Sequence, residues 1–202
     1  MSPRSKEQFE VIRQKSIEAI REAALELFAH NGYHSTSISQ IAKEAGVSKG
    51  LVYNYFESKE ALLQDIILDA VEMGEQFMAQ LLAATGDAAE QVRMLVKASF
   101  TVVKENRRYW KLMTSLALQT DVLTEMMPML KERQEAAFGE LTGMFRKLGA
   151  EKPREMAFYF GAVLDGLLLH YMQFGEEYPI KAMEAMVLER FLPGHPQNPK
   201  DT

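Results

Sequence analysis

Hydrophobic side chains recur at helical spacing along almost the whole chain, and no segment alternates strictly as a half-buried strand would. The pattern predicts helices at residues 7–31, 38–45, 49–55, 58–83, 88–105, 107–119, 122–148, 153–174 and 179–192. Capping signals support these bounds, with glycines at helix stops and prolines at first helical positions: Gly32, Gly149, Gly175, Pro153 and Pro179. We therefore expect an all-α protein of about nine helices, followed by a disordered tail at 193–202.

The second and third predicted helices are short and joined by a tight turn. Ser37 and Gln40 have the spacing of a capping box, which predicts a helix start at the next residue, Ile38. Gly46 follows that helix where a left-handed residue ends it, and Ser48 provides a second N-cap two residues later. Two capped helices at this spacing predict a helix-turn-helix.

The second of these helices has the residues expected of one that enters the DNA major groove by its N-terminal end. Lys49, Gly50, Tyr53 and Asn54 lie near that end, and Gly50 allows the backbone to approach DNA closely. Lys59, at the start of the next helix, adds a cation for phosphate. By contrast, Phe56 and Ser58 are expected to be a core residue and a cap, and Tyr55 fits either role.

These residues resemble the TetR/AcrR family of bacterial transcriptional regulators. The similarity covers about the first third of the chain and runs through Ala23–Tyr33, Thr36, Ile41–Ala42, Gly46–Ser48, Tyr53, Tyr55–Phe56 and Lys59–Leu62. In this family the first helix supports the DNA-reading unit. The resemblance implies DNA contacts by Ser37, Ser39, Ser48, Lys49, Gly50, Tyr53, Asn54, Tyr55 and Lys59. Tyr55 departs from the family pattern, because many members have histidine there.

Charge divides the chain after residue 60. Of 23 basic and 28 acidic side chains, 8 of each lie in residues 1–60, which leaves 15 basic and 20 acidic ones beyond. DNA must therefore be held by locally placed cations, and Arg4, Lys6, Arg13 and Lys15 are further candidates. We assign residues 1–60 to a three-helix DNA-binding domain, joined by a long fourth helix to a helical effector-binding and dimerisation domain at 61–192.

The predicted helix over Met156–Phe174 has one formal charge, Asp165, in nineteen residues. That charge and His170 argue against a membrane span. A helix that is apolar on all sides must instead be covered on all sides, so one face can pack on its own domain and another on a second copy, together with part of the 179–192 helix. We expect a homodimer through Tyr159, Phe160, Val163, Leu164, Leu167 and Tyr171, and the resemblance implies a four-helix interface. Two reading helices about 34–36 Å apart would then read a palindromic double-stranded operator.

Methionine is concentrated in the second part of the chain, where twelve of thirteen lie beyond residue 60. A flexible, polarizable core can repack around an apolar small-molecule effector. The resemblance places an effector pocket between the fourth and eighth helices, and the candidates for its lining are Phe77, Met78, Phe100, Trp110, Met113, Met126, Phe138, Phe145 and Phe158. Ordinary core packing is the alternative for each. If an effector fills such a pocket, it could shift the fourth helix and so change the spacing of the DNA-reading units.

An enzyme and a DNA-independent adaptor are the two alternative functions. An enzyme finds little support, because the four histidines lack metal-ligand spacing and no nucleophile elbow or phosphate-cradling loop is present. A DNA-independent adaptor is disfavoured because the second short helix has, near its N-terminal end, residues of the kind that contact DNA. With no cysteine and no apolar leader after Met1, we expect a cytoplasmic protein. We expect no cofactor, metal or catalytic residues. The family resemblance implies that the protein represses transcription.

Overall fold

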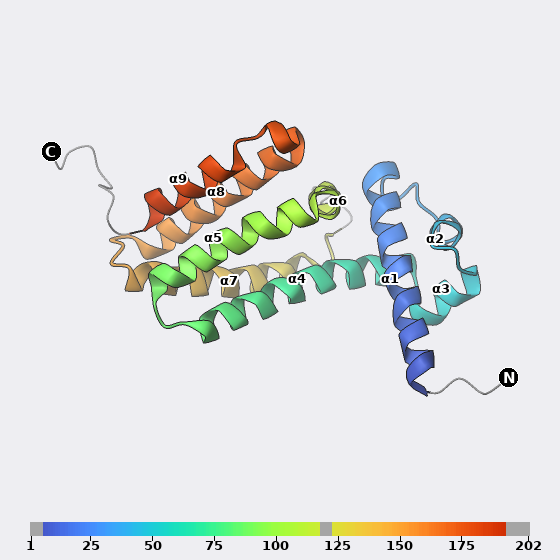
Figure 1. The fold of residues 1–202 in the computed structure, drawn as a ribbon. Helices are drawn as coiled ribbons and strands as arrows, with labels where there is room; N and C mark the ends of the chain where they lie inside the picture. The colour runs from blue at the N-terminus through green and yellow to red at the C-terminus, as the bar shows by residue number, and fades with distance from the viewer. Residues whose placement is uncertain (1–5, 118–122, 193–202) are drawn as a thin grey trace. The chain divides into compact units, whose positions relative to one another are not determined.

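The computed structural model describes residues 6–117 and 123–192, and every regular element in these two ranges is a helix (Figure 1). The elements are α1 (Lys6–Asn31), α2 (Ile38–Glu44), α3 (Lys49–Tyr55), α4 (Lys59–Ala84), α5 (Ala88–Glu105), α6 (Arg107–Ala117), α7 (Met127–Lys147), α8 (Pro153–Phe174), a 3₁₀ turn (Gly175–Glu177) and α9 (Ile180–Phe191). The all-α prediction is confirmed. The predicted tail at 193–202 lies outside the described residues.

Helix bounds agree closely with the sequence pattern, and α3, α5 and α8 match at both ends. The main difference concerns α7, which begins at Met127 and not at residue 122. Leu123–Met126 instead form a turn, in which the Met126 amide donates to the Leu123 carbonyl at 2.9 Å. Pro128 explains the later start, since proline is tolerated in the first turn, where its missing N–H has no intrahelical partner.

Local capping chemistry sets most of the helix ends. Gly32 and Gly149 have φ values of +82° and +79°, so the predicted helix stops are left-handed residues. Pro153 occupies the first turn of α8, as predicted. Asp87 caps α5 by accepting a hydrogen bond from the Ala89 amide at 2.9 Å.

One compact unit of the fold, unit 1, comprises residues up to Glu72 together with Leu112–Met126. Its buried side chains come from α1, α2, α3, the first turns of α4, the second half of α6 and the turn at Leu123–Met126, and include Phe28, Ile41, Val52 and Leu62. The predicted domain boundary after residue 60 falls inside this unit, because Leu62, Leu63, Ile66 and Ile67 of α4 are also buried. The first turns of α1 differ from the rest, since all side chains from Gln8 to Lys15 are exposed.

The second compact unit, unit 2, comprises Met73–Lys111 and the chain from Met127 onward. Within it α7 packs along α8, and α5 contacts α7, α8 and α9. Its main core cluster is rich in aromatic rings, and Phe145, Phe160 and Phe191 pack against one another with ring centres 5.0–6.0 Å apart. Edge-to-face packing of this kind contributes beyond simple burial.

Arg107 joins two elements of unit 2. Its guanidinium donates to the Met172 carbonyl at 2.7 Å and 3.2 Å, and so satisfies an acceptor near the C-terminus of α8. Gly175, with φ +63°, makes room for it, since a Cβ built there would lie 2.9 Å from Arg107 Nη1. This cap depends on a contact across 65 residues of sequence.

Residues 6–117 and 123–192 contain no group of three or more metal-ligating side chains placed to hold an ion. Within the same ranges, no helix combines the length and the hydropathy that crossing a membrane requires.

Candidate DNA interface

The turn between α2 and α3 is built by the caps that the sequence predicts. The Ser37 amide donates to Gln40 Oε1 at 2.8 Å, and the Gln40 amide donates to Ser37 Oγ at 3.3 Å, which confirms the capping box. Gly46 has φ +67°, so it reverses the chain after α2. Ser48 Oγ accepts from the Leu51 amide at 3.1 Å and starts α3. The predicted helix-turn-helix is present.

The face of α3 predicted to read DNA is exposed. Lys49, Gly50, Tyr53 and Asn54 are all exposed, while Val52 on the opposite side is fully buried. Tyr53 leaves 48% of its surface uncovered, which is unusual for so large a ring in a packed unit. The Lys49 ammonium nitrogen lies 5.8 Å from the centre of the Tyr53 ring, within cation–π range. Burial therefore anchors one side of α3 and leaves a polar, basic and aromatic side uncovered.

The three predicted serines are also exposed, and two of them have a second role. Ser37 and Ser48 are N-caps, so their hydroxyl oxygens already accept backbone hydrogen bonds. Ser39 lies in the first turn of α2 with an exposed side chain. All three are placed where a phosphate could be reached, and their DNA contacts stay predictions.

Lys59 has different surroundings from those expected of a phosphate contact. Its ammonium donates to the Tyr33 and Thr36 carbonyls, both at 2.9 Å, and lies 4.3 Å from the centre of the Tyr33 ring. The side chain therefore ties the segment after α1 to the start of α4. Two of its three N–H donors are engaged within the chain, so the structure assigns Lys59 a structural role that the sequence pattern did not indicate.

A polar network continues from this point. Tyr33 Oη donates to Glu60 Oε1 at 2.9 Å. Burial and this hydrogen bond raise the pKa of Tyr33 above its ordinary value. The Glu60 backbone amide, Tyr33 and Ser58 together lower the pKa of the Glu60 carboxyl, because they donate to its ionised form. The start of α4 is thus held by Lys59 and Glu60 against the same short segment.

A second link holds α1 to α4 within unit 1. Arg21 Nε donates to Asp65 Oδ2 at 2.5 Å, and Arg21 Nη1 donates to Asp69 Oδ1 at 2.9 Å. The hydrogen bond and charge of Asp65 raise the pKa of Arg21. Asp65 and Asp69 lie one helical turn apart, and this spacing was the only sign in the sequence that they could share a partner. That partner, Arg21, is 44 and 48 residues away from them. Periodicity alone does not reveal a pair at that separation.

The nine predicted effector-pocket residues are divided between the two units. Met113 and Met126 are buried in unit 1. In unit 2, Phe100 and Phe145 are fully buried, Phe77, Met78 and Phe138 pack against the same core, and Trp110 packs on a smaller cluster. Phe158 is 42% exposed, with its ring 4.4 Å from that of Phe138. Most of the nine are therefore packed as core residues here, and their effector role stays a prediction.

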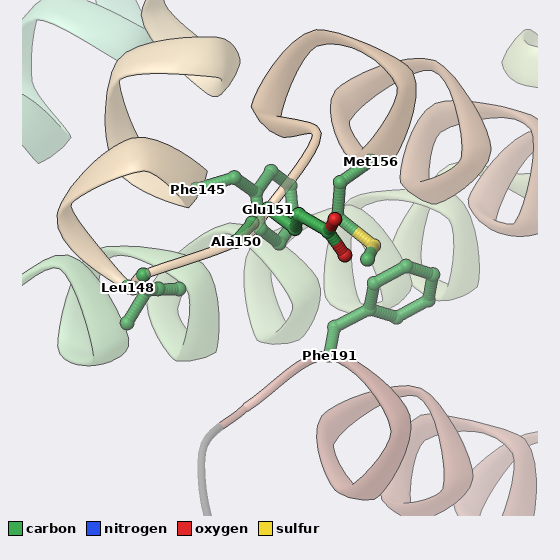
Figure 2. A pocket seen from close by; sticks show the side chains of 7 residues that line it. Phe145, Leu148, Ala150, Glu151, Met156 and Phe191 are labelled. Atoms are coloured by element: carbon green, nitrogen blue, oxygen red, sulfur yellow. The ribbon is translucent and has the colours of Figure 1, made fainter. Parts of the chain in front are cut away.

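A pocket of about 260 Å³ lies between the α7–α8 turn and the end of α9, with the Glu151 carboxylate on its wall (Figure 2). Its volume is below the roughly 300–1,000 Å³ of pockets for drug-sized ligands. Phe145 is the one predicted pocket residue among its lining residues, which are Phe145, Leu148, Gly149, Ala150, Glu151, Met156 and Phe191.

The predicted dimer residues need a correction. Phe160, Leu164 and Tyr171 are 1%, 7% and 4% exposed, so they belong to the core of their own unit and cannot offer surface to a partner. Val163 and Leu167 are half-buried, and Tyr159 is exposed. Three of the six predicted residues are thus covered by their own unit, because a sequence that is apolar on all sides does not show which side its own chain covers. The dimer itself stays a prediction.

The exposed side of α8 is a row of residues spaced three or four apart, Tyr159, Ala162, Asp165 and Leu169, which we call the α8 stripe. Its neighbour α9 exposes Ala182, Ala185 and Met186. Leu169 and Met186 are 39% and 59% exposed. An exposed apolar surface is therefore present on α8 and α9, and it includes Tyr159 and part of the 179–192 helix that the sequence predicted for the dimer.

Two capped helices joined by a left-handed glycine turn, with an exposed basic and aromatic face on the second, define a helix-turn-helix DNA-binding protein. Residues 20–66 match the model described as bacterial regulatory proteins, tetR family. Residues 20–66 therefore have the DNA-binding region typical of this family, and the chain is a DNA-binding transcriptional regulator.

Individual relatives match the chain beyond residues 20–66. The chain is 25% identical over 185 residues to the fatty acid metabolism regulator protein of Bacillus subtilis (strain 168), covering 87% of this chain and 93% of that protein. It is 31% identical over 103 residues to the transcriptional activator FasR of Mycolicibacterium smegmatis, covering 51% and 45%. The solved structure of FadR from Bacillus subtilis in complex with stearoyl-CoA is 24% identical, covers 88% of this chain and 98% of that chain, and has a TM-score of 0.70. That likeness shows a shared fold.

Proposed function

We propose that this regulator is a repressor that binds a two-fold symmetric operator as a homodimer and is released by an apolar small molecule. The observation that carries the proposal is the exposed face of α3, where Lys49, Gly50, Tyr53 and Asn54 lie opposite a fully buried Val52. A helix anchored on one side with its N-terminal turn uncovered is the arrangement by which this motif enters a major groove. Lys49 would contact phosphate and Asn54 a base edge.

Dimerisation is supported by the uncovered apolar residues of α8 and α9. The α8 stripe contains one carboxylate, Asp165, among Tyr159, Ala162 and Leu169, and the small Ala162 allows close approach of another helix. Removing such surface from water contributes roughly 25 cal/mol per Å². A dimer would bring two reading helices to one duplex and would favour an operator with inverted half-sites.

An apolar effector is supported by the composition of unit 2 and by the names of similar proteins. Its core has many half-buried hydrophobic neighbours, Phe77, Met78 and Phe138 among them, which could repack around a guest. The Bacillus subtilis relative is named for fatty acid metabolism, so we propose a long-chain acyl thioester as the first compound to test. Because α4 runs unbroken from unit 1 into unit 2, it is the element through which occupancy would change DNA affinity.

The proposal also places the protein in the cytoplasm, without catalytic activity. An enzyme would need a reactive cluster, and Asp165 and His170, two ionisable residues of α8, are both exposed. A sequence spacing of five residues does not put them on one helical face.

The DNA-binding proposal is tested by selection from a random duplex library at low salt, followed by footprinting of the selected duplex. We expect an inverted repeat protected over two adjacent major grooves, with two chains bound per duplex. Replacing Asn54 with Ala should change the selected sequence, whereas replacing Lys49 with Gln should weaken all duplexes alike. Failure of the wild-type protein to retain any duplex would refute the proposal and favour a DNA-independent adaptor.

The effector and the sign of regulation need separate measurements. Stearoyl-CoA should weaken binding to the selected duplex, and coenzyme A alone, which lacks the acyl chain, is the control. Unchanged DNA affinity at a concentration that measurably binds the protein would remove acyl thioesters from the proposal. Transcription in vitro from a promoter that contains the selected site should fall on adding the protein, and a rise would make it an activator.

A further inference from the structure

Arg13 of α1 lies beside Tyr55, the last residue of α3, although the two residues are 42 positions apart in the sequence. Its guanidinium carbon is 5.9 Å from the centre of the Tyr55 ring, within cation–π range. Arg13 Nη1 also donates to Glu10 Oε1 at 3.0 Å, one turn earlier on α1. The side chain is nonetheless 55% exposed, and that of Glu10 is 65% exposed.

These surroundings match the requirements of a phosphate-binding arginine. A ring against one part of the guanidinium limits its rotamers and leaves N–H groups to face outward, and the planar fork suits a phosphate as well as a carboxylate. The bond to Glu10 is an exposed i,i+3 pair, and such pairs contribute only about 0.3–0.5 kcal/mol. A phosphate can therefore replace that carboxylate at little cost.

The position of Arg13 beside α3 also favours phosphate binding. Lys49 lies beside Tyr53 at the N-terminal end of α3, and Arg13 lies beside Tyr55 at its C-terminal end. Both ends of the recognition helix thus have a cation next to a tyrosine. Phosphates line both rims of the groove that such a helix enters, and residues 1–60 as a whole have no excess of basic over acidic side chains. Each well-placed cation beside α3 consequently matters more than it would in a basic domain.

We propose that Arg13 binds a backbone phosphate of the operator, that Tyr55 positions its guanidinium, and that Glu10 occupies the same guanidinium when DNA is absent. This inference rests on the proposed function, since it requires that α3 enters DNA. It gives Tyr55 a positioning role in place of the direct phosphate contact implied by the family pattern, and it adds a DNA contact from α1.

The experiment measures affinity for the selected duplex as a function of salt concentration. Replacing Arg13 with Gln should lower affinity by roughly three- to tenfold at low salt and should flatten the plot of log affinity against log salt by about one unit per bound chain. Replacing Arg13 with Lys should keep the salt slope and lose part of the affinity, because the charge stays and the fork is lost. The matched control is Arg93→Gln in α5, which removes an exposed arginine paired with Glu90 at 2.9 Å in the same i,i+3 arrangement. That variant should behave as wild type.

Glu10 and Tyr55 test the mechanism. Replacing Glu10 with Gln should raise affinity, and the gain should shrink in the Arg13→Gln background, because the competition for the guanidinium is then absent. Tyr55→Phe keeps the ring and should bind nearly as wild type, whereas Tyr55→Leu should weaken binding mainly when Arg13 is present. Thermal unfolding of each variant checks that both units remain folded.

The outcomes separate this inference from the proposed function. If wild type and Arg93→Gln bind the duplex and Arg13→Gln binds it with an unchanged salt slope, the role of Arg13 is refuted and DNA recognition by α3 stands. If Tyr55→Phe lowers affinity as much as Tyr55→Leu, the tyrosine hydroxyl itself makes the contact and the positioning role is refuted. If wild type binds no duplex, both proposals fail together.

Discussion

Gly50 is the second residue of α3, and it has space for a side chain within the protein itself. A Cβ built there would meet only Ser48 Oγ, at 4.0 Å. Replacing Gly50 with Ala should leave the free energy of unfolding unchanged or raise it by up to about 1 kcal/mol, since alanine favours helix. The same change should lower DNA affinity by about tenfold, because the methyl group would lie between the backbone and the groove.

The control for Gly50 is Gly139→Ala in α7, which also has open space around it. It should stabilise the protein by a similar amount and leave DNA binding as it was. Urea unfolding and fluorescence anisotropy measure the two effects. If Gly50→Ala bound DNA as tightly as wild type, close approach of the backbone would be ruled out.

Lys59 and Lys49 are expected to differ, although the sequence predicted a DNA contact for both. Replacing Lys59 with Met removes two hydrogen bonds from an ammonium to the Tyr33 and Thr36 carbonyls, and should cost about 1.5–3 kcal/mol of unfolding free energy. Lys49 is exposed, so Lys49→Met should leave stability within about 0.5 kcal/mol and flatten the salt dependence of DNA binding. Urea unfolding of both variants measures the stability difference, and DNA binding at several salt concentrations measures the salt dependence. A flattened salt slope with unchanged stability in Lys59→Met would restore the phosphate role.

The Glu60 carboxyl should make stability depend on pH. Its pKa in the folded protein is lowered below the ordinary value of 4.5, so the ionised form stabilises the fold above that pH. This contribution is lost as the pH falls through the lowered pKa. The difference in unfolding free energy between wild type and Glu60→Gln should therefore be largest near neutral pH and should shrink below about pH 4.5. Urea unfolding across this range measures it, and a difference that grew on acidification would contradict the assignment.

At the scale of elements, the cap on α8 illustrates how separate segments stabilise one another. Arg107 at the start of α6 donates to carbonyls in the last turn of α8, where a positive charge is favoured by the helix dipole. Replacing Arg107 with Lys keeps the charge but loses the fork, and should lower the free energy of unfolding by about 1–2 kcal/mol. Arg146→Lys, an exposed change in the last turn of α7, is the control and should be neutral. Equal stability of the two variants in urea would show that the cap contributes only charge.

The elements also show how far the sequence could be read. Ser37, Gly46 and Ser48 act on backbone within a few residues, so local chemistry was enough to place α2, the turn and α3. The exposed face of α3 followed from the same periodicity. Relations between distant segments could not be predicted in this way, such as the carbonyl partners of Lys59 and the side of α8 that its own unit covers.

At the scale of the whole molecule, the proposed dimer should depend on the residues of α8 and α9 that the chain leaves exposed. Met186 is 59% exposed on α9, and a glutamate there should disrupt the dimer through an uncompensated charge in an apolar contact. Sedimentation velocity should then show a monomer, and affinity for the selected duplex should fall by at least about tenfold because one reading helix binds alone. Met73→Glu is the control, since Met73 is 47% exposed on α4. If both variants stayed dimeric, the interface would have to lie elsewhere.

The first turns of α1 have a consequence for dynamics. With every side chain from Gln8 to Lys15 exposed, this stretch gains little from burial and depends largely on its own backbone hydrogen bonds and on local contacts such as that of Arg13 with Tyr55. Short helices held in that way are marginal in water. Its amide hydrogens should exchange with deuterium far faster than those around Ala24 and Phe28, which are fully buried on the same helix. Slower exchange near Arg13 on adding the operator would therefore report DNA contact by a stretch of helix that the free protein does not hold firmly.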